Sequence, residues 1–334
     1  MTGCEGTARP TRPTNPTRLG HPTHLGRLGR LGRPYGLDGP LGTWRPLDRW
    51  VAGYALLTGL VLALGLARGV PGCGPQAVVS LAALLGARGL AHWTRDGRGQ
   101  GRTFLRLASG PALYWVFYHQ IPTLWAILWP VPLDGHLAAL EVRLWGTQPS
   151  LAFQAALPWR GLSELFCAAY FSYYLFVPAV GITALARRGY AVAERIILAT
   201  TGCFFSCYTL FWLLPTVGPH FWFPPGLGPQ LYRGYLFNHL LFSFTSGGEI
   251  RGGAFPSSHI AVAVLLTLLA RRATPALFPG LALATALLLP GVVYLRAHYL
   301  LDVPAGMLVG LIAYAWAAPG LPARPRAEPP PRRS

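Results

Sequence analysis

Residues 253–270 read Gly-Ala-Phe-Pro-Ser-Ser-His-Ile-Ala-Val-Ala-Val-Leu-Leu-Thr-Leu-Leu-Ala, a polar motif that runs directly into an apolar segment. A second polar motif, Arg296-Ala297-His298-Tyr299-Leu300-Leu301-Asp302, opens the last apolar segment of the chain. An apolar run by itself indicates only a membrane protein, whereas ionisable side chains at the ends of two such runs indicate a functional site. A shared site requires the fold to bring these two motifs together.

The composition is that of a membrane protein. The chain of 334 residues is 52% hydrophobic and only 12% charged, whereas soluble domains carry about 25% charged residues. The formal net charge of +17 comes from basic residues in the tails and in the connectors between apolar runs, which is typical of membrane topology rather than of nucleic-acid binding. All 28 basic residues are arginine. A cationic phosphate site must therefore use Arg, His or backbone N–H groups.

The apolar runs predict an all-α fold, a polytopic transmembrane bundle with a six-helix core and two extra N-terminal helices. A bilayer core of about 30 Å needs about 20 helical residues. Residues 1–45 and 319–334 are predicted to be disordered basic cytoplasmic tails, 46–106 to hold two transmembrane helices and a basic loop, and 107–318 to form the six-helix domain. The predicted spans are 50–67, 75–93, 107–130, 162–186, 196–217, 257–270, 276–294 and 300–318.

Arginine placement predicts the orientation. Most arginines fall in the tails and in alternate loops, and such basic loops stay in the cytoplasm. Both polar motifs then lie on the opposite, non-cytoplasmic face. An odd number of membrane crossings between the motifs would have placed them on opposite faces. The predicted topology places them on the same face, as a shared site requires.

The first motif has the features of a phosphate site at a helix start. Ser257 or Ser258 after a proline is a candidate N-cap, and the free N–H groups of the next turn can bind an anion. His259 in that turn can donate a proton to a leaving oxygen. Taken alone, this motif also fits an ordinary capped membrane helix with a histidine at the interface.

The second motif pairs a histidine with a carboxylate. His298 and Asp302 are four residues apart, so the carboxylate can accept from one ring nitrogen and leave the other free to attack phosphorus. Pro304 is tolerated only in a first helical turn, so the helix must begin near Leu300 or later. An interfacial His/Asp pair with a purely structural role is the competing interpretation.

Taken together, the two motifs resemble the type 2 phosphatidic acid phosphatase superfamily. Gly-Ala-Phe-Pro-Ser-x-His and Tyr-Leu-Arg-x-His-Tyr-x-x-Asp-Val are most similar to the inositol phosphorylceramide synthase and sphingomyelin synthase branch, and the similarity covers roughly 107–318. The resemblance implies that His298 is a nucleophile forming a phosphohistidine, that Asp302 orients it, and that His259 protonates the leaving alcohol. Ser257 and Ser258 would help to hold the phosphate.

The chain departs from the common family pattern at its cations. The family's lysine and the arginine six residues before the second histidine are missing, since position 292 is Val, and His220 stands where related chains often carry Arg. The phosphate is therefore expected to be held by some of a set of four cationic or titratable residues. The set comprises Arg296, which is the first choice, Arg251, Arg233 and His220.

The sequence thus predicts a multi-pass cell-membrane enzyme, a lipid phosphate phosphatase or phosphotransferase acting at the non-cytoplasmic face. Its expected partners are a lipid phosphate substrate and the bilayer, not nucleic acid, and an isoprenoid diphosphate is a further candidate substrate. No cofactor is expected, and the five cysteines lack the CxxC spacing of a metal site. The alternative is a non-catalytic lipid-binding or transport protein of the same fold, in which the two imidazoles need not converge. The sequence does not define the oligomeric state.

Overall fold

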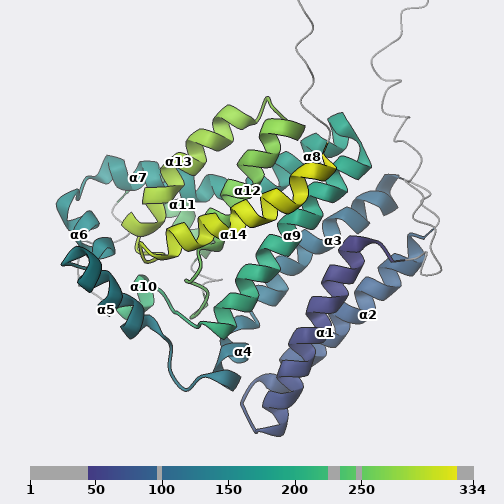
Figure 1. Cartoon of the computed structure of the whole chain (residues 1–334), viewed down its shortest axis with the longest axis horizontal. Helices are drawn as coiled ribbons and strands as arrows, with labels where there is room; N and C mark the ends of the chain where they lie inside the picture. The colour runs from purple at the N-terminus through teal and green to yellow at the C-terminus, as the bar shows by residue number, and fades with distance from the viewer. Residues whose placement is uncertain (1–43, 96–99, 225–233, 246–249, 322–334) are drawn as a thin grey trace, which may run out of the picture. The chain divides into compact units, whose positions relative to one another are not determined.

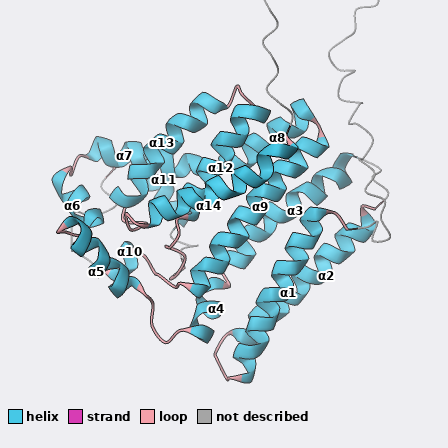
Figure 2. Ribbon diagram, in the orientation of Figure 1, coloured by secondary structure: helices cyan, strands magenta, loops and turns pink. Residues whose placement is uncertain are grey.

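The structure is a computed structural model that describes residues 44–95, 100–224, 234–245 and 250–321. Over these residues the chain is helical and has no strand, which confirms the predicted all-α class (Figures 1 and 2). Most of both predicted tails lies outside the described residues. The helices are α1 (Pro46–Ala67), α2 (Cys73–Trp93), α3 (Gln100–Tyr118), α4 (Ile121–Leu128), α5 (Asp134–Trp145), α6 (Pro149–Ala156), α7 (Arg160–Tyr173), α8 (Phe176–Arg188), α9 (Tyr190–Leu213), α10 (Pro219–Trp222), α11 (Leu236–Thr245), α12 (Ser258–Ala273), α13 (Phe278–Tyr294), α14 (Asp302–Ala317) and the 3₁₀ turn η2 (Ala318–Gly320).

Among the described residues, four helices are long and apolar enough to cross a membrane: α1, α2, α9, and α14 together with the turn that follows it. The α7 and α8 pair adds a fifth crossing if its 44° bend lies within one span. The remaining predicted spans are shorter or divided. Helices α12 and α13 have 16 and 17 residues, fewer than the roughly 20 that a bilayer core requires.

Prolines divide two of the predicted spans. The span at 107–130 is split into α3 and α4, and the span at 162–186 into α7 and α8. Pro122 and Pro178 each lie in the first turn of the second helix of a pair. Proline has no N–H and clashes with the preceding turn, so a helix restarts there more readily than it continues.

The first two helices form a hairpin (Figure 1), and a buried ion pair joins this hairpin to α3. Asp48 of α1 pairs with the guanidinium of Arg106 on α3. The same guanidinium donates to the Thr94 hydroxyl (3.0 Å), just beyond α2. Asp48 and Arg106 are almost fully buried. One arginine therefore joins three helices.

The two helices that carry the polar motifs cross at very short range. A Cβ atom placed on Gly306 of α14 would lie 2.4 Å from the carbonyl oxygen of Ser257, and one on Gly310 would lie 2.3 Å from that of Ala261. Glycines four residues apart let helix backbones approach in this way. The close contact brings the start of α12 against the start of α14.

Arginine side chains donate hydrogen bonds to backbone carbonyls at the C-terminal ends of α12 and α14. Arg188 donates to the carbonyl of Ala273 (3.0 Å), Arg195 to that of Trp316 (2.7 Å) and Arg272 to that of Ala318 (2.7 Å). The last carbonyls of a helix have no intrahelical partner, so these contacts satisfy groups that would otherwise be unpaired. The bundle thus has an arginine-rich end, and both polar motifs lie at the opposite ends of α12 and α14.

Candidate active site

His298 lies in a tight turn immediately before α14. Its Nδ1 atom is 2.8 Å from the carbonyl oxygen of Ala254 and 3.3 Å from Oδ2 of Asp302. That Oδ2 also accepts from the backbone N–H of Tyr299 (2.8 Å). As predicted, the helix begins after Leu300, yet the four-residue spacing still joins the imidazole to the carboxylate. Both side chains are buried.

His259 lies in the first turn of α12. Ser257 is the N-cap of this helix, as predicted, and its hydroxyl oxygen accepts from the N–H of Ile260 (3.3 Å). The N–H of Ser257 in turn donates to the carbonyl of Asp302 (3.1 Å), which joins the two motifs through their backbones. The rings of Tyr170 and Tyr173 lie against the His259 imidazole, with centroids 4.6 and 4.7 Å away.

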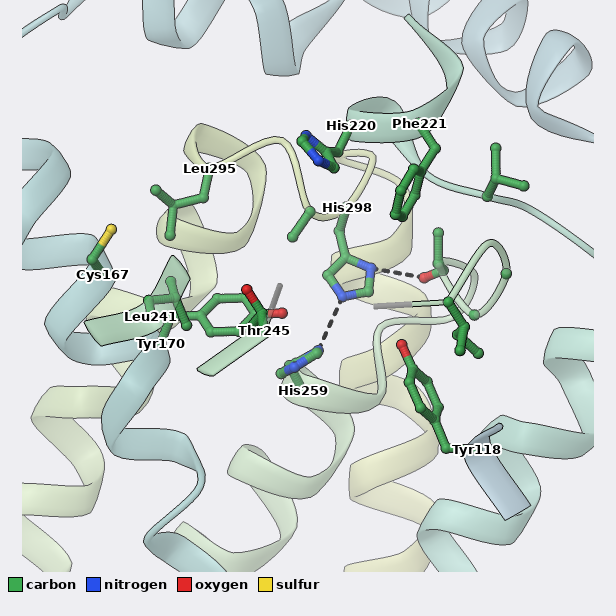
Figure 3. A pocket seen from close by; sticks show the side chains of 16 residues that line it. Tyr118, Cys167, Tyr170, His220, Phe221, Leu241, Thr245, His259, Leu295 and His298 are labelled. Carbon is green, nitrogen blue, oxygen red and sulfur yellow. Dashed lines mark hydrogen bonds between the residues drawn. The ribbon is translucent and has the colours of Figure 1, made fainter. Parts of the chain in front are cut away.

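The two imidazoles meet. Nδ1 of His259 is 3.2 Å from Nε2 of His298 (Figure 3). Since a carbonyl oxygen can only accept, the contact with Ala254 places the proton of neutral His298 on Nδ1. Its Nε2 therefore presents a lone pair toward His259, which donates. This is the protonation state that a nucleophilic histidine requires.

A pocket of about 110 Å³ opens beside the imidazole pair. Both histidines, residues 252–254, His220 and Phe221 help to line it (Figure 3). His220 is held in place by its backbone, which donates to the carbonyl of Arg296 (3.0 Å). The pocket gives a ligand direct access to the free face of the imidazole pair.

The other predicted phosphate contacts are not among the residues that line this pocket. Of these residues, Ser257 is buried as a helix cap, and Ser258 lines a neighbouring pocket instead. Arg296 occupies the turn before His298 with a left-handed φ of 59°, and burial lowers the pKa of its guanidinium. Arg251 is exposed, and its guanidinium lies 6.0 Å from the ring of Phe221 at the pocket wall. Arg233 lies outside the described residues.

A family model described as the PAP2 superfamily matches residues 136–316. The chain belongs to the PAP2 superfamily. No curated protein and no solved structure matches it. The family match covers both polar motifs and the helices that carry them, and it supports a phosphoesterase-type enzyme in general terms.

Two acidic side chains of α5 hold the backbone around the candidate site, and the sequence did not identify them. Asp134 accepts from the N–H groups of Val217 (2.7 Å) and Gly218 (2.9 Å) and from the Tyr299 hydroxyl (2.9 Å). It thus ties the loop before His220 to the residue that follows His298. Burial raises the pKa of Asp134, although these donors oppose the rise.

Glu141, the second of these carboxylates, accepts from the N–H of Leu301 (3.0 Å) and from Gln148. It therefore holds the last turn before α14. Glu164, by contrast, accepts from the N–H groups of Tyr235 (2.8 Å) and Phe237 (2.5 Å) and so caps the start of α11. For Asp134, Glu141 and Glu164, the available signal in the sequence was the same: each is a carboxylate with few partners among its sequence neighbours.

Proposed function

We propose that this PAP2 protein is a lipid phosphate phosphatase or phosphotransferase that acts through a phosphohistidine intermediate. The observation that carries the proposal is the 3.2 Å approach of the imidazole of His259, in the first turn of α12, to that of His298, in the turn before α14, where Ala254 and Asp302 orient the His298 ring. A non-catalytic protein of the same fold has no need for this convergence. The alternative of a purely lipid-binding or transport protein is therefore less well supported.

In the first half-reaction, Nε2 of His298 attacks phosphorus and the bond from phosphorus to the lipid oxygen breaks. Protonated His259 gives its proton to the departing oxygen, so the alcohol leaves neutral. Asp302 and the Ala254 carbonyl hold the Nδ1–H of His298 and stabilise the positive charge that develops on the ring.

In the second half-reaction, an oxygen nucleophile attacks the phosphohistidine and the bond from phosphorus to nitrogen breaks. His259, now neutral, takes the proton of the incoming hydroxyl. Water as the acceptor gives a phosphatase, and a lipid alcohol gives a transferase. The motif details shared with the inositol phosphorylceramide and sphingomyelin synthase branch favour transfer.

Arg251 and His220 are the proposed first contacts of the phosphate oxygens. Arg251 is exposed next to the pocket wall, and His220 lines the pocket itself. Neither arginine is among the residues that line the pocket, but Arg296, the first choice from the sequence, is buried in its turn whereas Arg251 is exposed. Its proposed role is to shape that turn. Arg251→Ala should then raise KM more than Arg296→Lys does.

The proposed location is a multi-pass arrangement in the cell membrane with the site on the non-cytoplasmic face. Its support is the arrangement of α12 and α14, whose arginine-bound ends lie opposite the imidazole pair. Basic residues favour the cytoplasmic side of a membrane.

The decisive experiment uses the full chain in liposomes with phospholipids labelled in the phosphate. Wild type should release inorganic phosphate or form a new labelled lipid, and acid-labile label should be trapped on the protein. His298→Ala should lose both signals and keep its thermal unfolding temperature. Equal turnover by wild type and His298→Ala would refute the mechanism.

A further inference from the structure

The N-terminal hairpin carries a pocket of its own, which we call the basic pocket. Its volume is about 600 Å³. The residues that line it are Trp44, Leu85, Arg88, Gly89 and His92. Helices α1 and α2 lie outside residues 136–316, which the family model matches. The basic pocket is therefore a feature of this chain beyond the matched family domain.

The basic pocket lies at the arginine-rich end of the bundle. Arg45, directly before α1, forms an ion pair with Glu194 near the start of α9 (3.8 Å). The next residue of α9, Arg195, donates to a carbonyl at the end of α14. Trp44 of the basic pocket adjoins Arg45, so this pocket and the imidazole pair lie at opposite ends of the bundle. In the proposed orientation, the basic pocket faces the cytoplasmic leaflet.

Arg88 is a cation on the outer surface of a helix that is apolar enough to cross a membrane. From Arg88 to the end of α2 at Trp93 is five residues, about 7.5 Å at 1.5 Å per residue. Among the described residues, no carboxylate or hydrogen-bond acceptor is paired with the Arg88 side chain. An unpaired charge at membrane depth is costly. An anion at headgroup level, which a long arginine side chain can reach, would remove that cost.

Two hydrogen-bond donors converge on the basic pocket. His92 lies one turn after Arg88 on the same face of α2, so the guanidinium and the imidazole can donate to oxygens of one phosphate. A Cβ atom added to Gly89, between them, would meet nothing within 4 Å, which leaves room for a headgroup. The described residues that line the pocket include no Asp or Glu. The ammonium of a zwitterionic headgroup would lack a counter-charge there, so the pocket favours a headgroup with net negative charge.

The same face of α2 continues toward the middle of the helix as apolar surface. Leu85 and Leu81 precede Arg88 by three and seven residues and are 57% and 54% exposed. Helical residues at these spacings share one face. Trp44 adds an aromatic ring of the kind that is enriched where a membrane meets water. From the end of α2 inward, the order is thus cationic, aromatic and aliphatic, which matches the order of phosphate, glycerol and acyl chains in a phospholipid.

We propose that the basic pocket binds the headgroup of an anionic phospholipid, with its phosphate at Arg88 and His92 and its acyl chains along Leu85 and Leu81. This lipid is not the substrate, because the imidazole pair lies at the other end of the bundle. The chain before Trp44 is a poor alternative occupant, since residues 1–43 contain six arginines and only two acidic residues. The bound lipid supplies the counter-charge of Arg88 and holds the hairpin in its leaflet.

The test is photo-cross-linking of the purified full chain in phosphatidylcholine nanodiscs that contain a phosphatidylglycerol with a diazirine on its headgroup. Wild type should be labelled within 85–92. Gly89→Leu fills the basic pocket and keeps both donors, so it should lose most of this label. Gly86→Leu is the matched control, because Gly86 lies on the same helix, has equal space and does not line the pocket. Gly86→Leu should keep the label, and a Gly89→Leu protein labelled as strongly as Gly86→Leu would overturn the proposal.

Charge variants separate a defined site from general attraction to an anionic membrane. Arg88→Gln should lower the labelling about fivefold, the contribution expected of one basic residue near a membrane surface. Arg187→Gln is the control, because Arg187 is an exposed arginine near the end of α8 and does not line the basic pocket. Equal losses in these two variants, or equal labelling by a phosphatidylcholine with the same diazirine, would overturn the site. His298→Ala should be labelled like wild type, so the outcome does not depend on the proposed chemistry.

Discussion

Nε2 of His298 lies 3.2 Å from Nδ1 of His259, so the two proposed catalytic rings are hydrogen-bonded to each other. In-line transfer needs an attack distance of about 3–3.5 Å on one side of the phosphoryl group and a proton-transfer distance of about 2.6–3.2 Å on the other. The sum of these two distances is longer than the separation of the two nitrogen atoms. A phosphoryl group must therefore part the rings when it binds.

Replacement of His259 should affect alkyl and aryl substrates differently. An alkoxide needs a proton to leave, whereas a nitrophenolate does not. We expect His259→Ala to slow cleavage of alkyl phosphates by about 10²–10⁴-fold and cleavage of p-nitrophenyl phosphate much less. The measurement is kcat on both substrates. His298→Ala should lose both activities, and equal losses in His259→Ala would exclude it as the general acid.

Removal of the Asp302 charge should lower kcat less than removal of the proposed nucleophile, His298, does. The Ala254 carbonyl, at 2.8 Å, also holds Nδ1 of His298 and keeps its tautomer. We expect Asp302→Asn to lower kcat by about 10–100-fold, as is usual for partners that orient a functional histidine. Single-turnover trapping of the phosphoenzyme measures this. A loss as large as that of His298→Ala would mean that the carbonyl contributes nothing.

The contact between α12 and α14 should not tolerate a methyl group. A Cβ atom at Gly306 would lie 2.4 Å from the Ser257 carbonyl oxygen, which is backbone and cannot move alone. We expect Gly306→Ala to destabilise the protein by about 1–3 kcal/mol and to lower activity by separating the two motifs. Gly280→Ala on α13, where nothing lies within 4 Å, is the control. Equal thermal unfolding temperatures for the two variants would contradict the close contact.

The Asp134 carboxyl should make stability depend on pH. Burial raises its pKa above the usual value of about 4, so the folded protein binds this proton more tightly than the unfolded chain does. Its contribution to stability is complete below the unfolded pKa and is lost as the pH rises through the folded pKa.

Asp134→Asn removes this titration, so the fall in thermal unfolding temperature from acidic toward neutral pH should become shallower. Glu141 keeps a slope of the same sign, because burial raises its pKa as well. Unfolding followed in detergent at several pH values measures the slope. An unchanged slope in Asp134→Asn would contradict the assignment.

The sequence predicted the helical class and the approximate places of the helices, because long apolar runs carry a strong local signal. It did not predict the divisions at Pro122 and Pro178, although both prolines were visible. Proline permits either a kink or a new helix, and tertiary packing decides between them. The Gly306 and Gly310 spacing was visible as well, but a glycine pair does not identify the helix that it faces.

In the site as well, contacts between residues close in sequence could be predicted, and most contacts between distant segments could not. His298 and Asp302 are neighbours through their spacing, and His259 joins them because the two helices between the motifs, α12 and α13, return the chain to the same end of the bundle. The Ala254 carbonyl carries no sequence signal, since every residue has one. The Asp134 contacts with Gly218 and Tyr299 join three distant segments, which only the folded chain reveals.

The arginines at the far ends of α12 and α14 have two roles in one set of side chains. The charge that would anchor these loops in the cytosol also supplies the N–H groups that finish the helices. A variant that neutralises Arg195 and Arg272 to weaken this anchor would therefore also leave the carbonyls of Trp316 and Ala318 at the end of α14 without these donors.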